Sequence, residues 1–396
     1  MTRWFAPGRI EVLGKHTDYA GGQSLIMALD RGVTVDVRPA PDGVTASTDA
    51  VRGAVELRSA TDLPAGHWAN YLRVILGRLE RNFGRVAPCT IDIASTLPLA
   101  SGMSSSSALL VATAMALVRF NGFDETAVWA REITSPEALA TYLACIENGS
   151  SFGDLVGDKG VGTFGGSEDH TAMVCCREDH VTRFRFGPAV RQGDVRVPDG
   201  LTFVAATSGV LAEKTGAARD AYNRASLTAQ AVTRRWNDAT GRADAHLGAA
   251  ITSAPDAVDR LTALVADDQV LADRLGHFLA ESERLVPGAA SALAAGDLTS
   301  LGGICDESQR LASTLLRNQV PETDRLAALA RSLGAHASSA FGAGFGGSVW
   351  ALTDGAGARD FAADWLAAYR AEFPQHALTS SALVSRPSGP QGEIVA

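Results

Sequence analysis

A loop of small residues that opens onto a long apolar run is the feature that most constrains the fold. Residues 98–107 read PLASGMSSSS, and in Ala108–Val118 the only polar residue is Thr113. The length and the Ala- and Leu-rich composition of this run predict a buried helix. The first N–H groups of a helix are unpaired and carry the positive end of its dipole, so such a loop can bind a phosphate. An ordinary N-cap needs one serine, and four in a row therefore favour the phosphate site.

The segments around this helix predict a mixed α+β chain. Polar and apolar residues alternate as in strands at Arg9–Leu13, Val33–Val37 and Cys89–Ile93. Apolar residues recur at helical intervals from Trp68 to Phe83 and near Glu137–Glu147. The first half of the chain is therefore expected to be rich in strands, with helices packed on them.

A change in composition near residue 200 predicts a second domain. A strand-like run, Leu201–Ala206, precedes helical patterns that continue to about residue 335, and the chain then returns to strand, glycine turn, strand and helix. A length of 396 residues suits two domains, since domains have roughly 100 to 200 residues each. We expect one domain over residues 1–195 and a helix-rich domain over 196–375. A last strand, within about 376–396, is a candidate to complete the N-terminal domain.

Charge and composition exclude several classes of partner. The net charge is −9 and no block of five like charges occurs, which argues against a nucleic-acid or anionic-membrane surface. No apolar run approaches the roughly 18 residues of a membrane span, and residues 1–7, MTRWFAP, lack the apolar core that a signal peptide would have. The five scattered cysteines form no CxxC pair and suit a reducing compartment. We expect a cytoplasmic protein with small-molecule partners, as a monomer or weak homodimer.

A zinc site near residue 175 is a weak alternative. His170, Cys175, Cys176 and His180 are close in the sequence. In an extended stretch, however, Cys175 and Cys176 would project to opposite faces and could not easily share one ion. We therefore do not expect zinc here.

The first of two further glycine-centred segments contains polar side chains that could bind a ligand. Residues 8–22 read GRIEVLGKHTDYAGG and bring together Arg9, Lys15, His16 and Asp18. A carboxylate that accepts from hydroxyl groups, beside side chains that donate, suits a polyhydroxylated ligand. A solvated loop is an equally good explanation of this composition.

The last glycine-rich segment, Phe341–Ser348, reads FGAGFGGS. It satisfies GxGxxG, but it runs into a strand-like stretch and not into a helix, which argues against a dinucleotide site. Gly209–Thr215 is no P-loop either, because Glu213 stands where the second glycine belongs.

In their order and spacing, the three segments resemble the motifs of the GHMP small-molecule kinases, and most closely those of the galactokinases. Gly8–Gly22 is similar to the signature GRxNxxGEHTDYxxG, Pro98–Ala108 to the loop PxxxGLSSSA, and Phe341–Ser348 to the third glycine-rich motif. Residues 68–71, WANY, are similar to a WxNY segment beside the nucleotide. The resemblance implies a two-domain α+β GHMP kinase fold, with a β-rich N-terminal ATP-binding domain and a helix-rich, ferredoxin-like C-terminal domain. ATP and sugar are then expected between the domains.

The resemblance also implies roles for individual residues. Asp169 matches the catalytic aspartate, and Arg9 matches the arginine that faces it, whereas Asp169 taken alone is typical of a turn after two glycines. Glu147 matches a magnesium ligand across an insertion, so Asp158 is a rival. The expected sugar ligands are Lys15, His16, Asp18, Gly166 and Tyr222; the expected nucleotide ligands are Trp68, Asn70, Gly102, Ser104, Ser105, Ser106, Ser107 and Gly344, and Ser106 is also an expected magnesium ligand.

The implied reaction is transfer of a phosphoryl group from ATP, with Mg²⁺, to the anomeric (C1) hydroxyl of galactose or a close relative. Such a transfer needs positioning, an acceptor for the hydroxyl proton and cationic stabilisation. Asp169 could accept the proton or only orient the hydroxyl, and Arg9 would keep that carboxylate ionised. The alternative of another class is a sugar- and ATP-binding sensor without transfer activity. The intact Arg9, Asp169 and Ser104–Ser107 argue against it.

Lys15 is the main departure from the family pattern. Galactokinases have Glu here, at the hydroxymethyl end of the sugar, and Lys removes an acceptor for the C6 hydroxyl. Since Lys15 would suit a C6 carboxylate, a galacturonate-type substrate is an alternative to galactose. Lys15 could also turn to solvent while galactose binds through His16, Asp18 and Tyr222.

Overall fold

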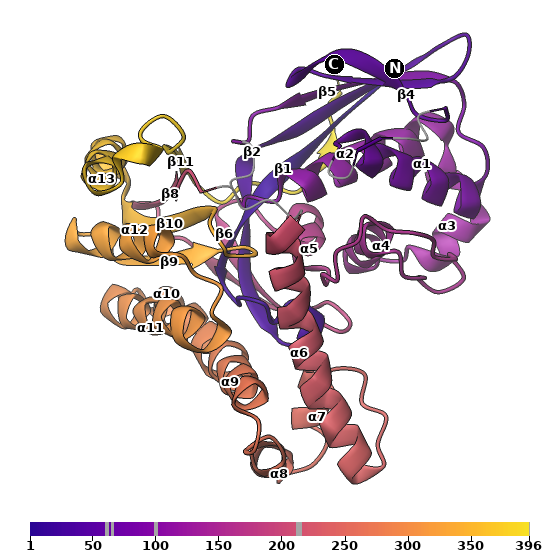
Figure 1. Ribbon diagram of the computed structural model, residues 1–396. Coiled ribbons are helices and arrows are strands. Elements are labelled where there is room, and N and C mark those ends of the chain that lie inside the picture. Colours follow the sequence, from indigo (N-terminus) through magenta and orange to yellow (C-terminus); the bar gives the residue numbers. More distant parts are fainter. Residues whose placement is uncertain (60–62, 65–66, 99–101, 211–215, 396) are drawn as a thin grey trace.

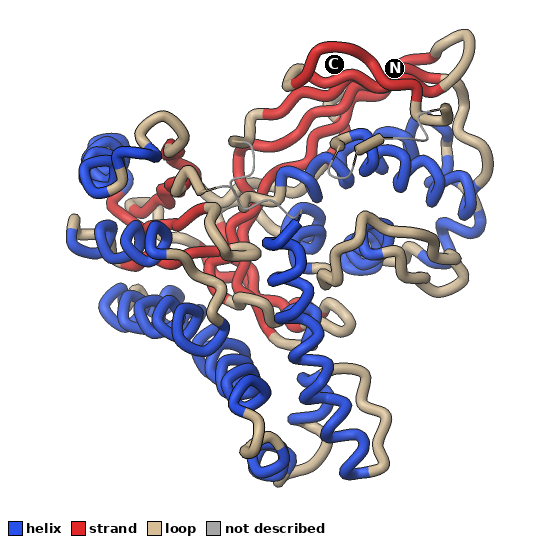
Figure 2. The backbone as a smooth tube through the Cα atoms, in the orientation of Figure 1, coloured by secondary structure: helices blue, strands red, loops and turns tan. Residues whose placement is uncertain are grey.

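Two sheets and the helices that pack on them make up the molecule (Figure 1). The computed structural model describes residues 1–59, 63–64, 67–98, 102–210 and 216–395, with no account of the side chains of 216–219. Figure 2 shows the larger sheet running from both chain ends toward the centre, where the smaller sheet meets it. The expected α+β fold is confirmed.

The larger sheet joins strands from both ends of the chain. Six of its eight strands in the described residues follow the order β12-β1-β2-β5-β3-β4, while β6 pairs with β2 and β7 with β6. All pairs are antiparallel except β3 with β5. The strands are β1 (Thr2–Leu13), β2 (Gln23–Pro39), β3 (Val44–Thr48), β4 (Val51–Glu56), β5 (Cys89–Ser95), β6 (His180–Arg185), β7 (Val190–Arg196) and β12 (Gly392–Glu393).

Five α-helices lie in the described residues of the first half of the chain. The apolar run after the serines forms α2, which packs on β1 and β2 and is buried along almost its whole length. The helix expected from Trp68 to Phe83 is present as α1, with Leu72, Ile75 and Leu79 buried. The helices are α1 (Ala69–Phe83), α2 (Ser105–Asn121), α3 (Ala127–Glu132), α4 (Pro136–Asn148) and α5 (Glu168–Cys175), with 3-10 turns at Asp18–Ala20 and Phe123–Glu125.

The smaller sheet is antiparallel, in the order β11-β8-β10-β9. Helices α11 and α12 pack on β9, and α13 packs on β8 and β11. Its strands are β8 (Leu201–Thr207), β9 (Ala337–Phe341), β10 (Ser348–Asp354) and β11 (Ser381–Ser385). The helices of this half are α6 (Gly216–Thr240), α7 (Leu247–Ile251), α8 (Ala257–Leu264), α9 (Gln269–Phe278), α10 (Val286–Ala295), α11 (Leu298–Leu311), α12 (Pro321–Ser332) and α13 (Ala358–Glu372), with π-helical turns at Leu279–Leu285 and Ala312–Leu316 and 3-10 turns at Gly355–Gly357 and Pro374–His376.

One apolar core connects the two sheets. Phe203 and Trp350 of the smaller sheet belong to the same buried cluster as β1, β2 and α2. Trp350 Nε1 also donates a hydrogen bond to the main-chain oxygen of Val12, at 3.1 Å. The end of β1, which lies within the first motif, is thereby fixed against the second sheet.

Three details differ from the sequence expectations or add to them. Residues 170–175 are not extended but helical, because they belong to α5. The hairpins β3–β4 and β6–β7 were not expected; β4 and β7 contain no buried residue, so their sequences show little alternation. At the C-terminus, β11 joins the smaller sheet and β12 the larger one. The domain boundaries themselves stay a prediction.

No helix within the described ranges is both long and apolar enough to span a bilayer. Nor do the described His, Cys, Asp and Glu side chains form any group of three or more that is arranged to hold a metal ion. All five cysteines are buried and unpaired.

Candidate functional site

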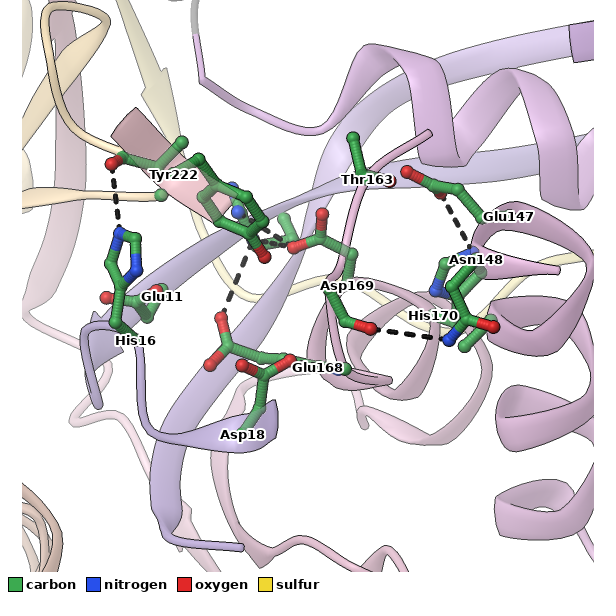
Figure 3. A pocket seen from close by; sticks show the side chains of 16 residues that line it. Glu11, His16, Asp18, Glu147, Asn148, Thr163, Glu168, Asp169, His170 and Tyr222 are labelled. Carbon is green, nitrogen blue, oxygen red and sulfur yellow. Dashed lines mark hydrogen bonds and ion pairs between the residues drawn. The ribbon is translucent and has the colours of Figure 1, made fainter. Parts of the chain in front are cut away.

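A cavity lies where the first and third motifs meet the start of α5 (Figure 3). Its walls come from the end of β1 and the turn after it, from α4, from the loop before α5, from α5 and α6, and from the turn between β9 and β10. Segments more than 300 residues apart in the chain therefore share one wall. The lining residues are Arg9, Glu11, His16, Asp18, Ala144, Glu147, Asn148, Thr163, Gly165, Gly166, Glu168, Asp169, His170, Tyr222, Gly342 and Ala343.

Arg9 and Asp169 form the central ion pair of this cavity. Nε and Nη2 of Arg9 both lie 2.8 Å from Oδ1 of Asp169, and Nη1 donates to the main-chain oxygen of Gly102 at 2.5 Å. Burial alone would lower the pKa of Arg9, but the nearby charges of Asp169, Glu168 and Glu11 outweigh it and raise that pKa. Arg9 is therefore a permanent cation beside Asp169.

Ser107 connects this pair to the helix that follows the serine-rich loop. Its Oγ donates to Oε2 of Glu147 at 2.9 Å and to Oδ2 of Asp169 at 3.3 Å. Nε2 of His170 lies 3.3 Å from the same oxygen of Glu147. The N-terminal turn of α2 is thus held directly against both carboxylates.

The polar residues of the first motif form the opposite wall. His16 has a positive φ of 58°, and its ring nitrogens lie 2.8 Å from Tyr19 Oη and 3.0 Å from the main-chain oxygen of Ala343. The ring of Tyr222 is 5.1 Å from that of His16. Asp18 Oδ2 accepts from the main-chain N–H of Glu168 at 3.3 Å. Three of the expected sugar ligands, His16, Asp18 and Tyr222, therefore face one space.

Gly166 lets the loop before α5 pass close to Asp18. A Cβ atom at this position would lie 2.5 Å from Asp18 Oδ2, a distance that real Cβ atoms do not show. The loop can line the cavity at this point only because the residue is glycine.

Lys15 does not line the cavity, contrary to the expectation that it contacts the sugar. Its Nζ donates to Ser308 Oγ and Ser339 Oγ, both at 2.8 Å, and lies 3.9 Å from Glu281 Oε1. Only 1% of Lys15 is exposed, so it does not turn to solvent either. The sequence could not indicate this, because the partners lie on elements that follow it by more than 260 residues.

The expected nucleotide residues divide into two groups. Ser107 is buried and hydrogen-bonded to the cavity residues Glu147 and Asp169, and Gly102 touches the third motif, where a Cβ on Gly342 would be 2.9 Å from the main-chain oxygen of Gly102. Ser104 is the N-cap of α2, with a positive φ of 57°, and Ser105 and Ser106 form its first turn. Residues 99–101 of this loop, and the Glu213–Thr215 segment that failed the P-loop pattern, lie outside the described residues.

None of the eight expected nucleotide residues is among those that line the cavity. Trp68, Asn70 and Gly344 contact residues that do not line it either, although Gly344 is the chain neighbour of Ala343, which does. Trp68 stacks on His67 at the start of α1, and the Asn70 side chain donates to the main-chain oxygen of Pro64 at 3.0 Å. Gly344 has a φ of 78° and lies against the main chain of Asn318. Their roles toward a nucleotide stay predictions.

Two acidic residues of the cavity, Glu11 and Glu168, were missed by the sequence reasoning. Burial raises the pKa of Glu11 to about 7, against the opposing charges of Lys15 and Arg9. Burial, followed by the charges of Glu11 and Asp18, raises the pKa of Glu168 well above its ordinary value. One signal was available, because the signature GRxNxxGEHTDYxxG has Asn where this chain has Glu11.

Comparison with known sequences finds three family matches along the chain. The galactokinase galactose-binding signature matches residues 2–39, the GHMP kinase N-terminal domain residues 70–156, and the GHMP kinase C-terminal domain residues 289–371. Galactokinase from Roseiflexus sp. is 29% identical over 372 residues, which cover 92% of this chain and 86% of the relative. Galactokinase from Streptomyces coelicolor is 26% identical over 365 residues, which cover 89% and 85%.

Solved structures with the same fold cover almost the entire chain. Lactococcus lactis galactokinase complexed with galactose matches with a TM-score of 0.78 at 20% identity, over 99% of this chain and 95% of that one. Mevalonate kinase from L. major matches with a TM-score of 0.59 at 15% identity, over 98% and 97%. With both kinase domains, the signature ahead of them and this fold, the chain belongs to the GHMP kinase superfamily and is galactokinase-like.

Proposed function

We propose that this protein is an ATP-dependent kinase that phosphorylates the anomeric hydroxyl of galactose. The observation that carries the proposal is the position of Asp169, which is held by Arg9 and Ser107 where the start of α2 meets the cavity. The galactokinase signature over residues 2–39 and the galactokinase relatives support galactose as the sugar.

The roles of the side chains follow from their contacts. Asp169 accepts the proton of the attacking hydroxyl or orients it, and Arg9 keeps that carboxylate ionised. Arg9 also offsets negative charge on the transferring phosphoryl group. His16, Asp18 and Tyr222 hold the sugar hydroxyls on the opposite wall, and the N-terminal turn of α2 receives the phosphates.

Magnesium fits beside Glu147. Mg²⁺ in kinases is bound through one or two carboxylates together with substrate phosphates, and the carboxylate of Glu147, on α4, accepts a hydrogen bond from Ser107 in the N-terminal turn of α2. The rival Asp158 instead pairs with Arg81 at 2.7 Å, with 47% of its side chain exposed, and it does not line the cavity. Ser106, in the same turn of α2 as Ser107, is the hydroxyl that we propose as a second ligand of the metal. When bound, the metal neutralises charge on the phosphates.

A uronic acid is not favoured as the substrate. Lys15, which would have met a C6 carboxylate, is directed away from the cavity toward Ser308 and Ser339. The cavity instead presents five acidic side chains to its contents, and Arg9, the lining residue with a fixed positive charge, is already paired with Asp169. A sugar carboxylate would be repelled there.

The test is ADP release with ATP and Mg²⁺ against galactose, galacturonate, glucuronate, N-acetylgalactosamine and arabinose. We expect galactose to be preferred, and Asp169→Asn to lower kcat/KM by roughly 10²- to 10⁴-fold while sugar binding by calorimetry persists. Asp267→Asn is the matched control, because Asp267 is an exposed carboxylate paired with Arg235 away from the cavity. Preference for an acidic sugar, or full turnover by Asp169→Asn, would contradict the proposal. Sugar binding without ADP release would support the sensor.

A further inference from the structure

One buried oxygen of the cavity lacks a partner. Glu11 lies on β1, is 3% exposed and lines the cavity, and within the described part of the chain its Oε1 has no hydrogen-bond partner (Figure 3). A buried polar atom left without a hydrogen bond is costly, so nearly all such atoms in folded proteins are satisfied. The position of Glu11 in the wall of the cavity allows a bound molecule to supply the missing donor.

The neighbouring charged groups already have partners of their own. Glu168 accepts a hydrogen bond from Ser24 Oγ at 2.5 Å, and its Oε1 lies 3.9 Å from Arg9 Nε. Arg9 directs its two shortest ion-pair contacts to Asp169. Glu168 also shares a side-chain hydrogen bond with Glu11, but Oε1 of Glu11 has no hydrogen-bond partner among the described residues.

Lys15 and Glu281 likewise form a separate set. Nζ of Lys15 donates to two serines, and Glu281 accepts from the main-chain N–H groups of Gly14 and Lys15 at 2.9 and 3.3 Å. Glu281 does not line the cavity. A purely structural role for Glu11, as a counter-charge to Arg9 and Lys15, would explain its charge but not the unpaired oxygen at the cavity wall.

We propose that Glu11 is a specificity-determining residue of the sugar site, whose Oε1 accepts a hydrogen bond from a hydroxyl group of the bound neutral hexose. This inference rests on the proposed kinase function and names a contact within the same site. It also explains together the two departures from the signature, which are Glu11 in place of Asn and Lys15 in place of Glu. The acidic side chain that faces the cavity comes from position 11, while the side chain at position 15 is directed toward the second sheet.

The experiment compares galactose with its 2-, 3-, 4- and 6-deoxy analogues, using wild type and Glu11→Gln. The substitution keeps the size of the side chain and removes its charge. Loss of a charge-assisted hydrogen bond lowers kcat/KM for galactose by roughly ten- to hundredfold, and we expect most of this loss in KM. For the analogue that lacks the contacted hydroxyl, the two enzymes should have equal kcat/KM, since neither can make the bond.

Glu281→Gln is the matched control, because it removes a buried carboxylate of the same region that lies outside the cavity. Glu281→Gln should lower the melting temperature and change kcat/KM by the same factor for galactose and its four deoxy analogues. The inference is wrong if Glu11→Gln also acts by one factor on every sugar, or has no effect on any.

Binding measured without ATP separates this inference from the kinase proposal. If the wild type binds galactose but releases no ADP, the kinase proposal fails, and the dissociation constants of the deoxy series with both enzymes still decide the role of Glu11. If no sugar of the series binds, both proposals fail.

Discussion

At the scale of single residues, the site is dominated by charges buried side by side. Arg9, Glu11, Lys15, Glu168 and Glu281 are each at most 5% exposed. Removing charges from water is costly, and the cost is recovered only where opposite charges and hydrogen bonds surround each group. Changes at these positions should therefore affect stability as well as activity.

Glu11 gives the stability of the protein a defined pH dependence. Its pKa is about 7 in the folded protein and ordinarily 4.5, so between these values the folded state binds more protons than the unfolded state. The stability that protonated Glu11 provides is fully present below pH 4.5 and is lost as the pH rises through 7. We expect the free energy of unfolding of wild type minus that of Glu11→Gln to fall from pH 4.5 to 7 and then stay level. Urea titrations across this range measure it, and a difference that rises instead would contradict the assignment.

Lys15→Glu should destabilise the protein and not improve galactose use. The new carboxylate would face Glu281, whose Oε1 lies 3.9 Å from the lysine nitrogen. Breaking a buried ion pair costs about 3 to 5 kcal/mol. Lys15→Met, which removes the charge without adding a like one, should cost less. Chemical denaturation with parallel kcat/KM values checks this, and a stable Lys15→Glu variant with raised galactose use would return Lys15 to the sugar site.

At the scale of elements, glycines and helix ends bring the motifs together. The N-terminal turn of α2 reaches Glu147 and Asp169 through Ser107, and the β9–β10 turn approaches Gly102 because Gly342 has no side chain. The loop before α5 depends on Gly166 in the same way.

Gly166→Ala should weaken sugar binding while the fold is retained. Its Cβ would collide with Asp18 Oδ2, so the carboxylate or the loop must move. We expect KM for the sugar to rise by roughly tenfold or more, because small displacements of positioning groups are costly. Gly77→Ala is the control: it lies in α1 with nothing near the added Cβ, and should stabilise the protein by up to about 1 kcal/mol. Unchanged KM for Gly166→Ala would exclude close contact between this loop and the sugar-binding wall.

At the scale of the whole molecule, the two sheets depend on each other. Trp350 is fully buried, packs on Phe203 within the core shared with β1 and α2, and donates to Val12. The cavity likewise takes its walls from both halves of the chain. The cavity is therefore incomplete without both halves, and the largest core spans them, although the second half also has a core cluster of its own.

Thermal unfolding should therefore occur as one transition. Trp350→Ala removes a side chain that links the sheets and should reduce the free energy of unfolding by about 3 to 5 kcal/mol. The temperature of the single transition should fall, and the transition should not split into two. Differential scanning calorimetry measures this. Two well-separated transitions in the wild type would show that the shared core does not couple the halves.

The sequence by itself determined the main elements and the place of the site. The helical spacing of apolar residues over 68–83 predicted α1, because a helix that buries one face repeats its apolar residues with the period of the helix. The length and composition of the apolar run 108–118 predicted α2. The resemblance to the galactokinases implied that Arg9, His16, Asp18, Asp169 and Tyr222 serve one site, and the structure brings these five residues to one cavity. Helix α5 was not predicted, because its eight residues are too few to give a clear period.

Only the tertiary structure decided where the side chains of positions 11 and 15 point. Both flank the end of β1, and the sequence suggested that Lys15 contacts the sugar while giving Glu11 no role. The partners of Lys15, which are Ser308, Ser339 and Glu281, come from segments that no local pattern connects to it. A local pattern reports how a segment is buried and not what it packs against, so the acidic character of the cavity emerges only when distant elements meet.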